Sequence, residues 1–160
     1  LNLATPKPYY AYPPRARFHG VALMEGYGTY MAQVAEISLD SSGMVKVQKI
    51  TCALDCGQIV NPDIVNAQVE GSIIFGLTSA LWGEINVQGG RVQQTNFHDY
   101  RLLRMNEAPL IDVFVVNSSQ APGGIGGPAV ALVAPGVCNG MHAATGRRVR
   151  SLPLARHRFA

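Results

Sequence analysis

The sequence is poor in charged and aromatic side chains. Charged residues make up 14% of the 160 residues and aromatic residues 8%, whereas 48% are hydrophobic. This balance excludes an intrinsically disordered chain, which combines high charge with few apolar residues. We therefore expect one globular domain, or part of a larger one, with a core built mainly from Val, Ile, Leu and Ala.

An excess of charge of either sign is nearly lacking as well. The net charge is only +3, and much of the basic excess comes from arginines after residue 146. Contact of this end with nucleic acid or an acidic partner would explain them, but we favour a solvated terminus. We predict no nucleic-acid partner.

Cysteine is scarce. The three cysteines, Cys52, Cys56 and Cys138, are an odd number, which excludes a complete disulfide framework. No cluster of Cys or His follows the first two to complete a zinc site. We interpret the cysteines as small buried residues and predict no metal site built from this chain's own side chains.

Long apolar runs and a targeting segment are also missing. No uninterrupted apolar run approaches the roughly 18 residues that a bilayer-spanning helix needs. The first residue is Leu1, and no signal peptide follows it. We expect an excerpt of a longer chain or a processed product.

Proline and turn residues divide the chain into three predicted parts. Residues 1–18 hold four prolines among several tyrosines, which predicts an extended connector. Residues 19–154 form the predicted domain, and residues 155–160 a basic tail.

Alternating apolar residues predict the strands. The segments 33–39 and 45–50 alternate on either side of Asp40-Ser41-Ser42-Gly43 and predict a hairpin. A second hairpin is predicted within residues 84–97, turning at residues 88–90. The last predicted strand covers residues 111–116.

Two helices are predicted. Asn61-Pro62 combines an N-cap residue with a proline suited to a first helical turn, so a helix should run from about residue 62 to residue 83. Its apolar residues lie on nearly all sides, which predicts a helix buried in the centre. A C-terminal helix is expected from Pro135 to Thr145, with Gly146 as its stop. The predicted fold class is α+β, with a mixed or antiparallel sheet and its hairpins packed on the long buried helix and the C-terminal helix.

Gln68 and Glu70 are polar residues on the helix that we expect to be buried. A buried amide or carboxylate is costly unless it has a partner. For Glu70 we favour a structural hydrogen bond or ion pair over a chemical role.

The most unusual stretch is Gly123-Gly124-Ile125-Gly126-Gly127-Pro128. Glycine allows positive φ and close approach of another group, and proline suits the start of a helix. A tight turn is the simple interpretation, and a loop whose amides face a ligand is the alternative. The stretch is neither a dinucleotide fingerprint nor a phosphate loop, because the βαβ spacing and the Lys-Ser/Thr pair are missing.

The histidines offer little chemistry. His98 precedes Asp99, but no serine on a sharp nucleophile turn completes a triad. We favour surface hydrogen bonding for His98 and a satisfied packing role for His142. These residues alone indicate an α+β domain with an unusual glycine loop.

Several stretches, taken in order, resemble one known family. The stretches are GTYMAQVAE (28–36), CALDCG (52–57), Asn61-Pro62, QVEG (68–71), NFHDY (96–100), the glycine loop, AATG (143–146) and RSLPL (150–154). The whole set resembles the C-terminal part of the molybdopterin-binding large subunit of the xanthine dehydrogenase/aldehyde oxidase family. It is most similar to the isoquinoline 1-oxidoreductase β-subunit branch, which includes membrane-associated aldehyde dehydrogenases. The resemblance covers residues 19–154.

The resemblance implies a molybdenum hydroxylase that oxidises an aldehyde or an N-heterocycle. The implied cofactor is a molybdopterin with molybdenum, often in its cytosine dinucleotide form, shared with preceding domains of the large subunit. The implied electron path runs through [2Fe-2S] clusters on a small iron–sulfur subunit, with a cytochrome c as a candidate acceptor. Family analogy also implies a periplasmic or membrane-associated location.

The resemblance assigns cofactor contacts as well. Gln68 matches a glutamine whose amide hydrogen-bonds the pterin, since an amide offers both donors and acceptors. The backbone of Gly124, Ile125, Gly126 and Gly127 is implied to line the same pocket.

One position departs from the family pattern. The family reads Gly-x-Gly-Glu-Pro, and its glutamate is the general base; here that position is Gly127. Glycine cannot accept a proton, and Glu70 and Glu107 lie on other elements.

Three hypotheses follow. The first is part of a molybdenum hydroxylase large subunit that contributes to a composite pocket and is inactive alone. The second is a non-catalytic binding or assembly domain that kept the fold but lost the catalytic glutamate. The third is a divergent pterin- or nucleotide-binding module that never carried metal.

Overall fold

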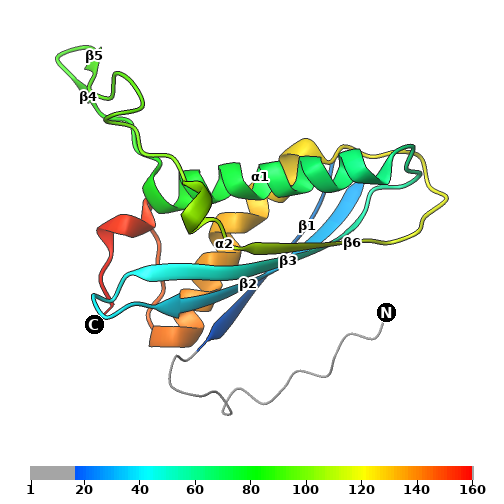
Figure 1. Cartoon of the computed structure of the whole chain (residues 1–160), viewed down its shortest axis with the longest axis horizontal. Coiled ribbons are helices and arrows are strands. Elements are labelled where there is room, and N and C mark those ends of the chain that lie inside the picture. The colour runs from blue at the N-terminus through cyan, green and yellow to red at the C-terminus, as the bar shows by residue number, and fades with distance from the viewer. Residues whose placement is uncertain (1–16, 160) are drawn as a thin grey trace.

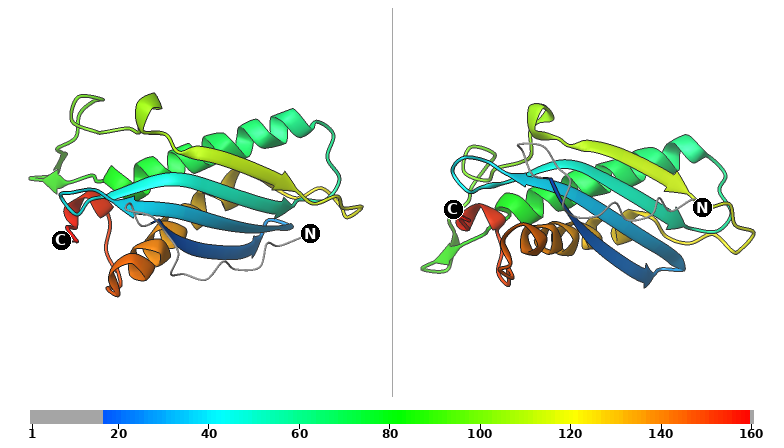
Figure 2. Two further views of the ribbon diagram at one scale, coloured as in Figure 1. Left: turned by 60° about the horizontal axis from the view of Figure 1, so that its bottom comes forward. Right: turned by 90° about the horizontal axis from the view of Figure 1, so that it is seen from below.

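The computed structural model describes residues 17–159. Two long helices lie against one face of a four-stranded sheet, and a two-stranded arm projects from the body (Figures 1 and 2). The predicted connector at residues 1–18 lies outside the described residues except for its last two positions. The predicted α+β fold class is confirmed.

Three strands pair antiparallel in sequence order, and the predicted hairpin at residues 33–50 is confirmed. Its turn is closed by the Asp40 carboxylate, which accepts the N–H groups of Ser42 at 2.8 Å and Met44 at 3.0 Å. The Ser42 hydroxyl and these amides together lower the pKa of Asp40. The strands are β1 (Phe18–Gly26), β2 (Thr29–Leu39) and β3 (Val45–Asp55).

The fourth strand, β6 (Leu110–Val115), runs parallel to β3, with Lys49 opposite Leu110 and Leu54 opposite Val115. The sheet is therefore mixed, in the order β1-β2-β3-β6. Parallel neighbours need a long crossover connection, and the segment between these two strands contains the first helix.

That helix, α1 (Pro62–Trp82), has the predicted bounds. The Asn61 side-chain oxygen caps it by accepting the N–H groups of Asp63 at 3.1 Å and Ile64 at 3.2 Å. Gly83 follows its last turn, where its N–H donates to two α1 carbonyls.

α1 is buried along one side only. Val69, Ile73 and Leu77 are fully buried, whereas Ile64 and Phe75 are each 64% exposed. By length and composition alone, α1 could cross a membrane. Half of the relevant stretch is buried inside the molecule, and core helices of soluble proteins pass the same test.

The prediction that Gln68 and Glu70 are buried is wrong, because both side chains are exposed. The apolar pattern misled because apolar side chains such as Phe75 also occupy the outer side of α1. The pattern of one helix cannot show whether a second layer covers each of its faces.

The second helix, α2 (Gly126–Thr145), does not begin at Pro135 as predicted. Pro135 lies inside the helix, and Pro128 occupies the first turn, where a missing N–H costs nothing because no intrahelical partner exists. The predicted end is confirmed: Gly146 has φ 70° and donates its N–H to the His142 carbonyl at 2.8 Å.

Glycines set the distance between α2 and its neighbours. A Cβ at Gly20 on β1 would overlap the Gly136 carbonyl and the Gly140 nitrogen of α2. On the α1 side, a Cβ at Gly76 would lie 2.8 Å from the Val133 side chain. Because these glycines have no side chains, α2 lies directly on the sheet and on α1.

Between α1 and β6 the chain forms an arm that extends away from the body (Figure 1). Its tip pairs β4 (Val87–Gln88) with β5 (Arg91–Val92), and Gly89 and Gly90 at the turn both have positive φ. The predicted second hairpin is confirmed, with shorter strands.

The C-terminal residues return to the body. Phe159 is buried and donates its N–H to the Gly43 carbonyl at 3.0 Å, and the Arg156 guanidinium pairs with Glu84. The boundary at residue 154 stays a prediction, but residues 155–159 contact the domain instead of extending from it.

Replacing Gly20 by alanine should push α2 away from β1. The added methyl group would meet backbone atoms that cannot rotate aside, so we expect the free energy of unfolding to fall by about 3 kcal/mol or more. Urea denaturation measures this. Gly71→Ala is the matched control: its Cβ meets nothing within 4 Å, so this helical position should gain about 0.5–1 kcal/mol. Equal effects of the two changes would contradict the packing argument.

Candidate functional site

Three hydrogen bonds hold the glycine loop, residues 123–127, against the sheet. The N–H of Gly123 donates to the Cys56 carbonyl at 2.9 Å, and the N–H of Gly124 donates to the Tyr27 carbonyl at 2.8 Å. The hydroxyl of Thr29, a fully buried residue, donates to the Gly124 carbonyl at 2.8 Å. The backbone of the loop is thereby fixed to the β1–β2 turn and the end of β3.

Close approach explains the glycine at position 123. A Cβ there would overlap the Gly28 carbonyl and lie 2.5 Å from the Thr29 hydroxyl oxygen. A side chain would therefore separate the loop from the β1–β2 turn. The cluster is not a tight turn but a segment packed across another turn.

Tyr27 lies over the next part of the loop. Its φ of 58° is uncommon for a residue other than glycine, and its side chain is 74% exposed. The atoms nearest to a Cβ built at Gly127 are Cε2, Cζ and the hydroxyl oxygen of Tyr27, at 3.6, 3.7 and 3.9 Å. These are ordinary contact distances, so position 127 has room for a side chain.

Gln68 reaches the loop from α1. A Cβ at Gly126 would lie 3.1 Å from Gln68 Nε2, so only a small residue leaves this amide undisturbed. One turn along, the Ser72 hydroxyl lies 2.9 Å from the Gly126 carbonyl and 2.7 Å from the Gln68 carbonyl. Ser72 thus joins the two helices where Gln68 is exposed.

The first turn of α2 has backbone N–H groups that no side chain within residues 17–159 caps. Ile125 at the N-cap makes no side-chain cap, and Pro128 has no N–H. The N–H groups of Gly126 and Gly127 therefore lie uncapped at the positive end of the helix dipole, which attracts anionic groups. Gly124 differs, because its own N–H and carbonyl are both engaged within the chain.

The structure thus brings the predicted residues Gln68, Gly126 and Gly127 together, with Gly124 and Ile125 beside them. Sequence reasoning missed the residues that position them: Tyr27, Thr29 and Ser72. Tyr27-Gly28 between two strands was a usable signal, because left-handed residues mark hairpin turns.

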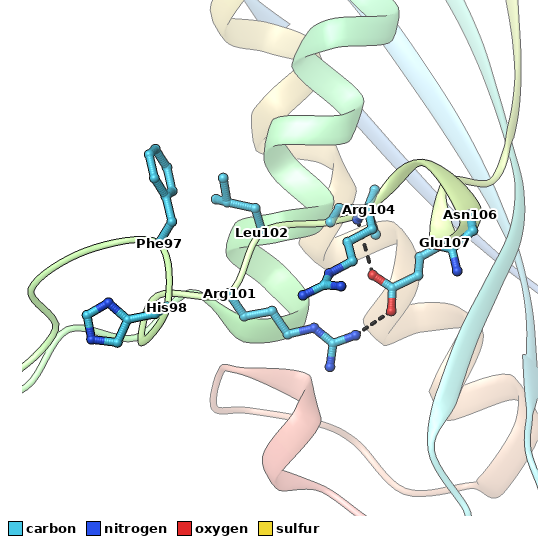
Figure 3. A pocket seen from close by; sticks show the side chains of 8 residues that line it. Phe97, His98, Arg101, Leu102, Arg104, Asn106 and Glu107 are labelled. Atoms are coloured by element: carbon cyan, nitrogen blue, oxygen red, sulfur yellow. Dashed lines mark hydrogen bonds and ion pairs between the residues drawn. The ribbon is translucent and has the colours of Figure 1, made fainter.

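A separate hollow of about 640 Å³ lies along residues 97–107. Figure 3 shows Phe97 and His98 at its outer edge, with Arg101 and Glu107 on the other side. Glu107 pairs with the Arg101 guanidinium, which also lies 4.0 Å above the Trp82 ring. The charges of Arg101 and Glu107 are already paired with each other, so these two residues are less available to an ionic ligand in the hollow.

His98 and Asp99 form no catalytic pair here. His98 is exposed, which agrees with its predicted surface role. Asp99 accepts the N–H groups of Asn96 and Thr95, both at 2.9 Å, and these bonds lower its pKa to about 2. Asp99 therefore closes a loop.

The prediction that His142 is satisfied by its packing is wrong. Its Nδ1 is buried without a hydrogen-bond partner in the described part of the chain. The ring borders the segment 148–152, which brings no polar atom to this nitrogen.

The cysteines are not reactive nucleophiles. Cys52 and Cys56 are buried, as predicted, and burial raises the pKa of Cys52 to about 11. Residues 17–159 contain no group of three or more Cys, His, Asp or Glu that could hold a metal ion.

Comparison with known proteins identifies the family. Residues 7–109, more than half of the chain, match the molybdopterin cofactor-binding domain. The chain belongs to this family. The predicted likeness to the xanthine dehydrogenase family and to its isoquinoline 1-oxidoreductase branch is confirmed: relatives include the xanthine dehydrogenase molybdenum-binding subunit of Escherichia coli O157:H7, 32% identical over 72% of this chain and 16% of that protein.

Isoquinoline 1-oxidoreductase subunit beta of Brevundimonas diminuta is 39% identical over 140 residues, which are 84% of this chain and 18% of that protein. The membrane-bound aldehyde dehydrogenase of Gluconacetobacter polyoxogenes is 33% identical over 130 residues, 81% of this chain and 17% of that protein. The chain therefore spans less than a fifth of the length of these relatives.

Quinoline 2-oxidoreductase from Pseudomonas putida 86 shares the fold. Its structure matches with a TM-score of 0.72 and 20% identity, over 81% of this chain and 19% of that chain.

The glycine loop fits one edge of a molybdopterin. The exposed Gln68 amide offers two donors and an acceptor, and the uncapped N–H groups of α2 suit an anionic oxygen. Gly126 and Gly127 bring no side chains of their own, and within residues 17–159 the atoms nearest to a Cβ built at either position belong to Gln68 and Tyr27.

Replacing Thr29 by valine should loosen the glycine loop. Valine has nearly the same shape but cannot donate to the Gly124 carbonyl, so we expect a loss of about 1 kcal/mol and faster hydrogen exchange at the Gly124 amide. Exchange followed by mass spectrometry measures this. Thr51→Val, on the far face of the sheet, is the control, and unchanged exchange at Gly124 would disprove the role of Thr29.

Proposed function

We propose that this chain forms one wall of a composite molybdopterin pocket, in a molybdenum hydroxylase subunit that oxidises an aldehyde or an N-heterocycle. The observation that carries the proposal is the exposed Gln68 amide beside the uncapped first turn of α2, in a member of the molybdopterin cofactor-binding family. The names of the relatives, isoquinoline 1-oxidoreductase and aldehyde dehydrogenase, support this substrate class.

A bound molybdopterin would supply the metal centre for the oxidation. The chain's own residues would bind and orient this cofactor. The Gln68 amide would hold the edge of the pterin, and the N–H groups of Gly126 and Gly127 would hold an anionic oxygen. Thr29 and Ser72 keep the backbone fixed, so these donors need no rearrangement when the ligand arrives.

The chain lacks a group to remove a proton at position 127. The family resemblance puts the general base there, and loss of a positioned base typically costs about 10²–10⁴-fold in rate. Glu107 is paired with Arg101, and the three atoms nearest to a Cβ built at Gly127 all belong to Tyr27, which is not a carboxylate. We therefore propose that the isolated chain does not turn over substrate.

The finer parts of the proposal concern the assembly. The cofactor would be the cytosine dinucleotide form, as the family resemblance implies, and a phosphate of the cofactor would be the anionic partner of the α2 amides. The partners would be the rest of the large subunit and a small iron–sulfur subunit with [2Fe-2S] clusters, with a cytochrome c as acceptor. The location would be periplasmic or membrane-associated.

A second function is a non-catalytic binding or assembly domain. Gly127 favours it, because a domain that needs no base has no use for a carboxylate there. Molybdenum analysis of the natively purified complex separates the two: stoichiometric molybdenum supports the first, and a folded complex without molybdenum supports the second. The third hypothesis, a metal-free nucleotide-binding module, requires the isolated chain to bind a nucleotide in a Gln68-dependent manner.

Gly127→Glu should restore the missing base. The Cβ at this position meets only ordinary contacts with Tyr27, and an acidic residue in a first helical turn is favourable, so folding should be unaffected. In the assembled complex we expect aldehyde or N-heterocycle oxidation to rise by about 10²–10⁴-fold. Gly127→Gln, which has the same size but no base, should give no increase. A complex that is already fully active with Gly127 would show that the assigned position of the base is wrong.

Gln68→Ala should weaken retention of the cofactor. Loss of one or two hydrogen bonds of about 0.5–1.5 kcal/mol each corresponds to roughly a three- to tenfold lower affinity or more. Molybdenum content after dialysis of the complex measures this, with Gln93→Ala on the arm as control. Equal molybdenum retention in both variants would remove Gln68 from the site.

A further inference from the structure

The outer face of the four-stranded sheet, on the side away from α1 and α2, is uncovered within residues 17–159. Successive residues of a strand point to opposite faces of the sheet. On β2, Met31, Gln33 and Ala35 point inward and are buried, so the residues between them point to the outer face. Its centre is apolar. We call six of its residues the outer patch: Val21, Leu23, Ala32, Val34, Ala53 and Phe114.

The outer patch is continuous across the sheet. Leu23, Ala32, Ala53 and Phe114 are neighbours in register and form one row over all four strands. Leu23 is 75% exposed and Phe114 is 55% exposed. Large side chains thus stand on the two edge strands, with alanines between them.

The residues of this face also indicate that it is normally covered. An antiparallel sheet can leave one face in water, and that face is then mostly polar. Here a whole row across the sheet is apolar, and it continues onto the parallel pair β3 and β6. Phe114 lies on this parallel pair and Leu23 on the opposite edge, so the exposed area is wider than one isolated side chain.

Polar side chains lie beside the apolar row and at the ends of the face, and their charges are paired. Thr51 and Asp112 continue the row of Val21 and Val34. Lys49 and Asp112 are 2.5 Å apart, and Arg17 and Glu36 are 2.5 Å apart. At the other end Tyr30 donates to Glu25 at 3.0 Å. A patch with an apolar centre and a self-neutralised rim suits an apolar protein layer better than a polyanion.

We propose that the outer patch is the surface on which another segment of the same molybdenum-binding subunit packs, most simply a helix whose apolar side lies across the row of Leu23, Ala32, Ala53 and Phe114. This inference rests on the proposed function. The matched regions are 18% and 17% of the two curated relatives, so more than four fifths of their length lies outside and can supply this layer. A second copy of the chain and a lipid surface are the competing occupants.

Hydroxyl-radical footprinting with mass spectrometry tests the proposal. The 160-residue chain alone is compared with the natively produced complex that contains it, with rates normalised to an added reference peptide. Leu23 and Phe114 should be oxidised at least tenfold more slowly in the complex. Lysine-directed cross-linking of the same sample should join Lys49, at the rim, to another segment of the same subunit. Equal oxidation rates, or cross-links only between copies of this chain, would overturn the proposal.

A pair of substitutions gives an independent check. Leu23→Lys should not change the urea midpoint of the isolated chain, because Leu23 is exposed, but should lower the yield of assembled complex at least tenfold. Met105→Lys, at a residue 97% exposed on another surface, should leave both unchanged. Normal assembly of the Leu23→Lys complex would contradict the proposed occupant. A Leu23→Lys chain that assembles normally but no longer binds phosphatidylglycerol vesicles would also contradict it and would indicate a lipid surface instead. Molybdenum content is measured in each sample, so that a molybdenum-loaded complex with an open outer patch would refute this inference alone.

Discussion

Direct backbone contact between the glycine loop and the β1–β2 turn is the constraint on which the site depends. Gly123 and Gly124 donate to carbonyls on two different segments, and Thr29 returns a hydrogen bond from the buried side. No side chain separates the two backbones, so the loop has little freedom to shift. The donors of the first turn of α2 follow directly from this fixed point.

The far half of α2 is held by the same physical device. Gly20 lets the carbonyl of Gly136 and the nitrogen of Gly140 approach β1, where any larger residue would overlap backbone. Near the start of α2, the buried Gln33 side chain donates to the Ala129 carbonyl at 2.8 Å. One helix is therefore fixed at its start, its first turns and its second half, which gives a ligand-binding edge the rigidity that it needs.

The molecule is one-sided in two places, and the two proposals give both the same explanation. The glycine loop and Gln68 form a single wall with exposed donors, and the sheet has helices on one face and an apolar outer patch on the other. A chain that matches less than a fifth of its relatives' length would show both features where the rest of the subunit packs. The position of Gly127, beside Tyr27 and without a carboxylate, is a property of this chain itself and does not depend on missing protein.

The sequence alone determined the elements whose signals are local. Asn61-Pro62 and Gly83 set the bounds of α1, Asp40 set a hairpin turn, and ordered motifs identified the family. Tertiary structure decided the rest. Burial of Gln68 was misjudged because helical periodicity does not reveal which faces meet a second layer. The start of α2 was misjudged because Pro135 breaks a helix by propensity, yet packing on β1 and α1 carries the helix through it. Tyr27, Thr29 and Ser72 could not be assigned to the site from the sequence, because they reach the loop through contacts between distant parts of the chain. Thr29 and Gly124, for example, are 95 positions apart, and only the fold brings them together.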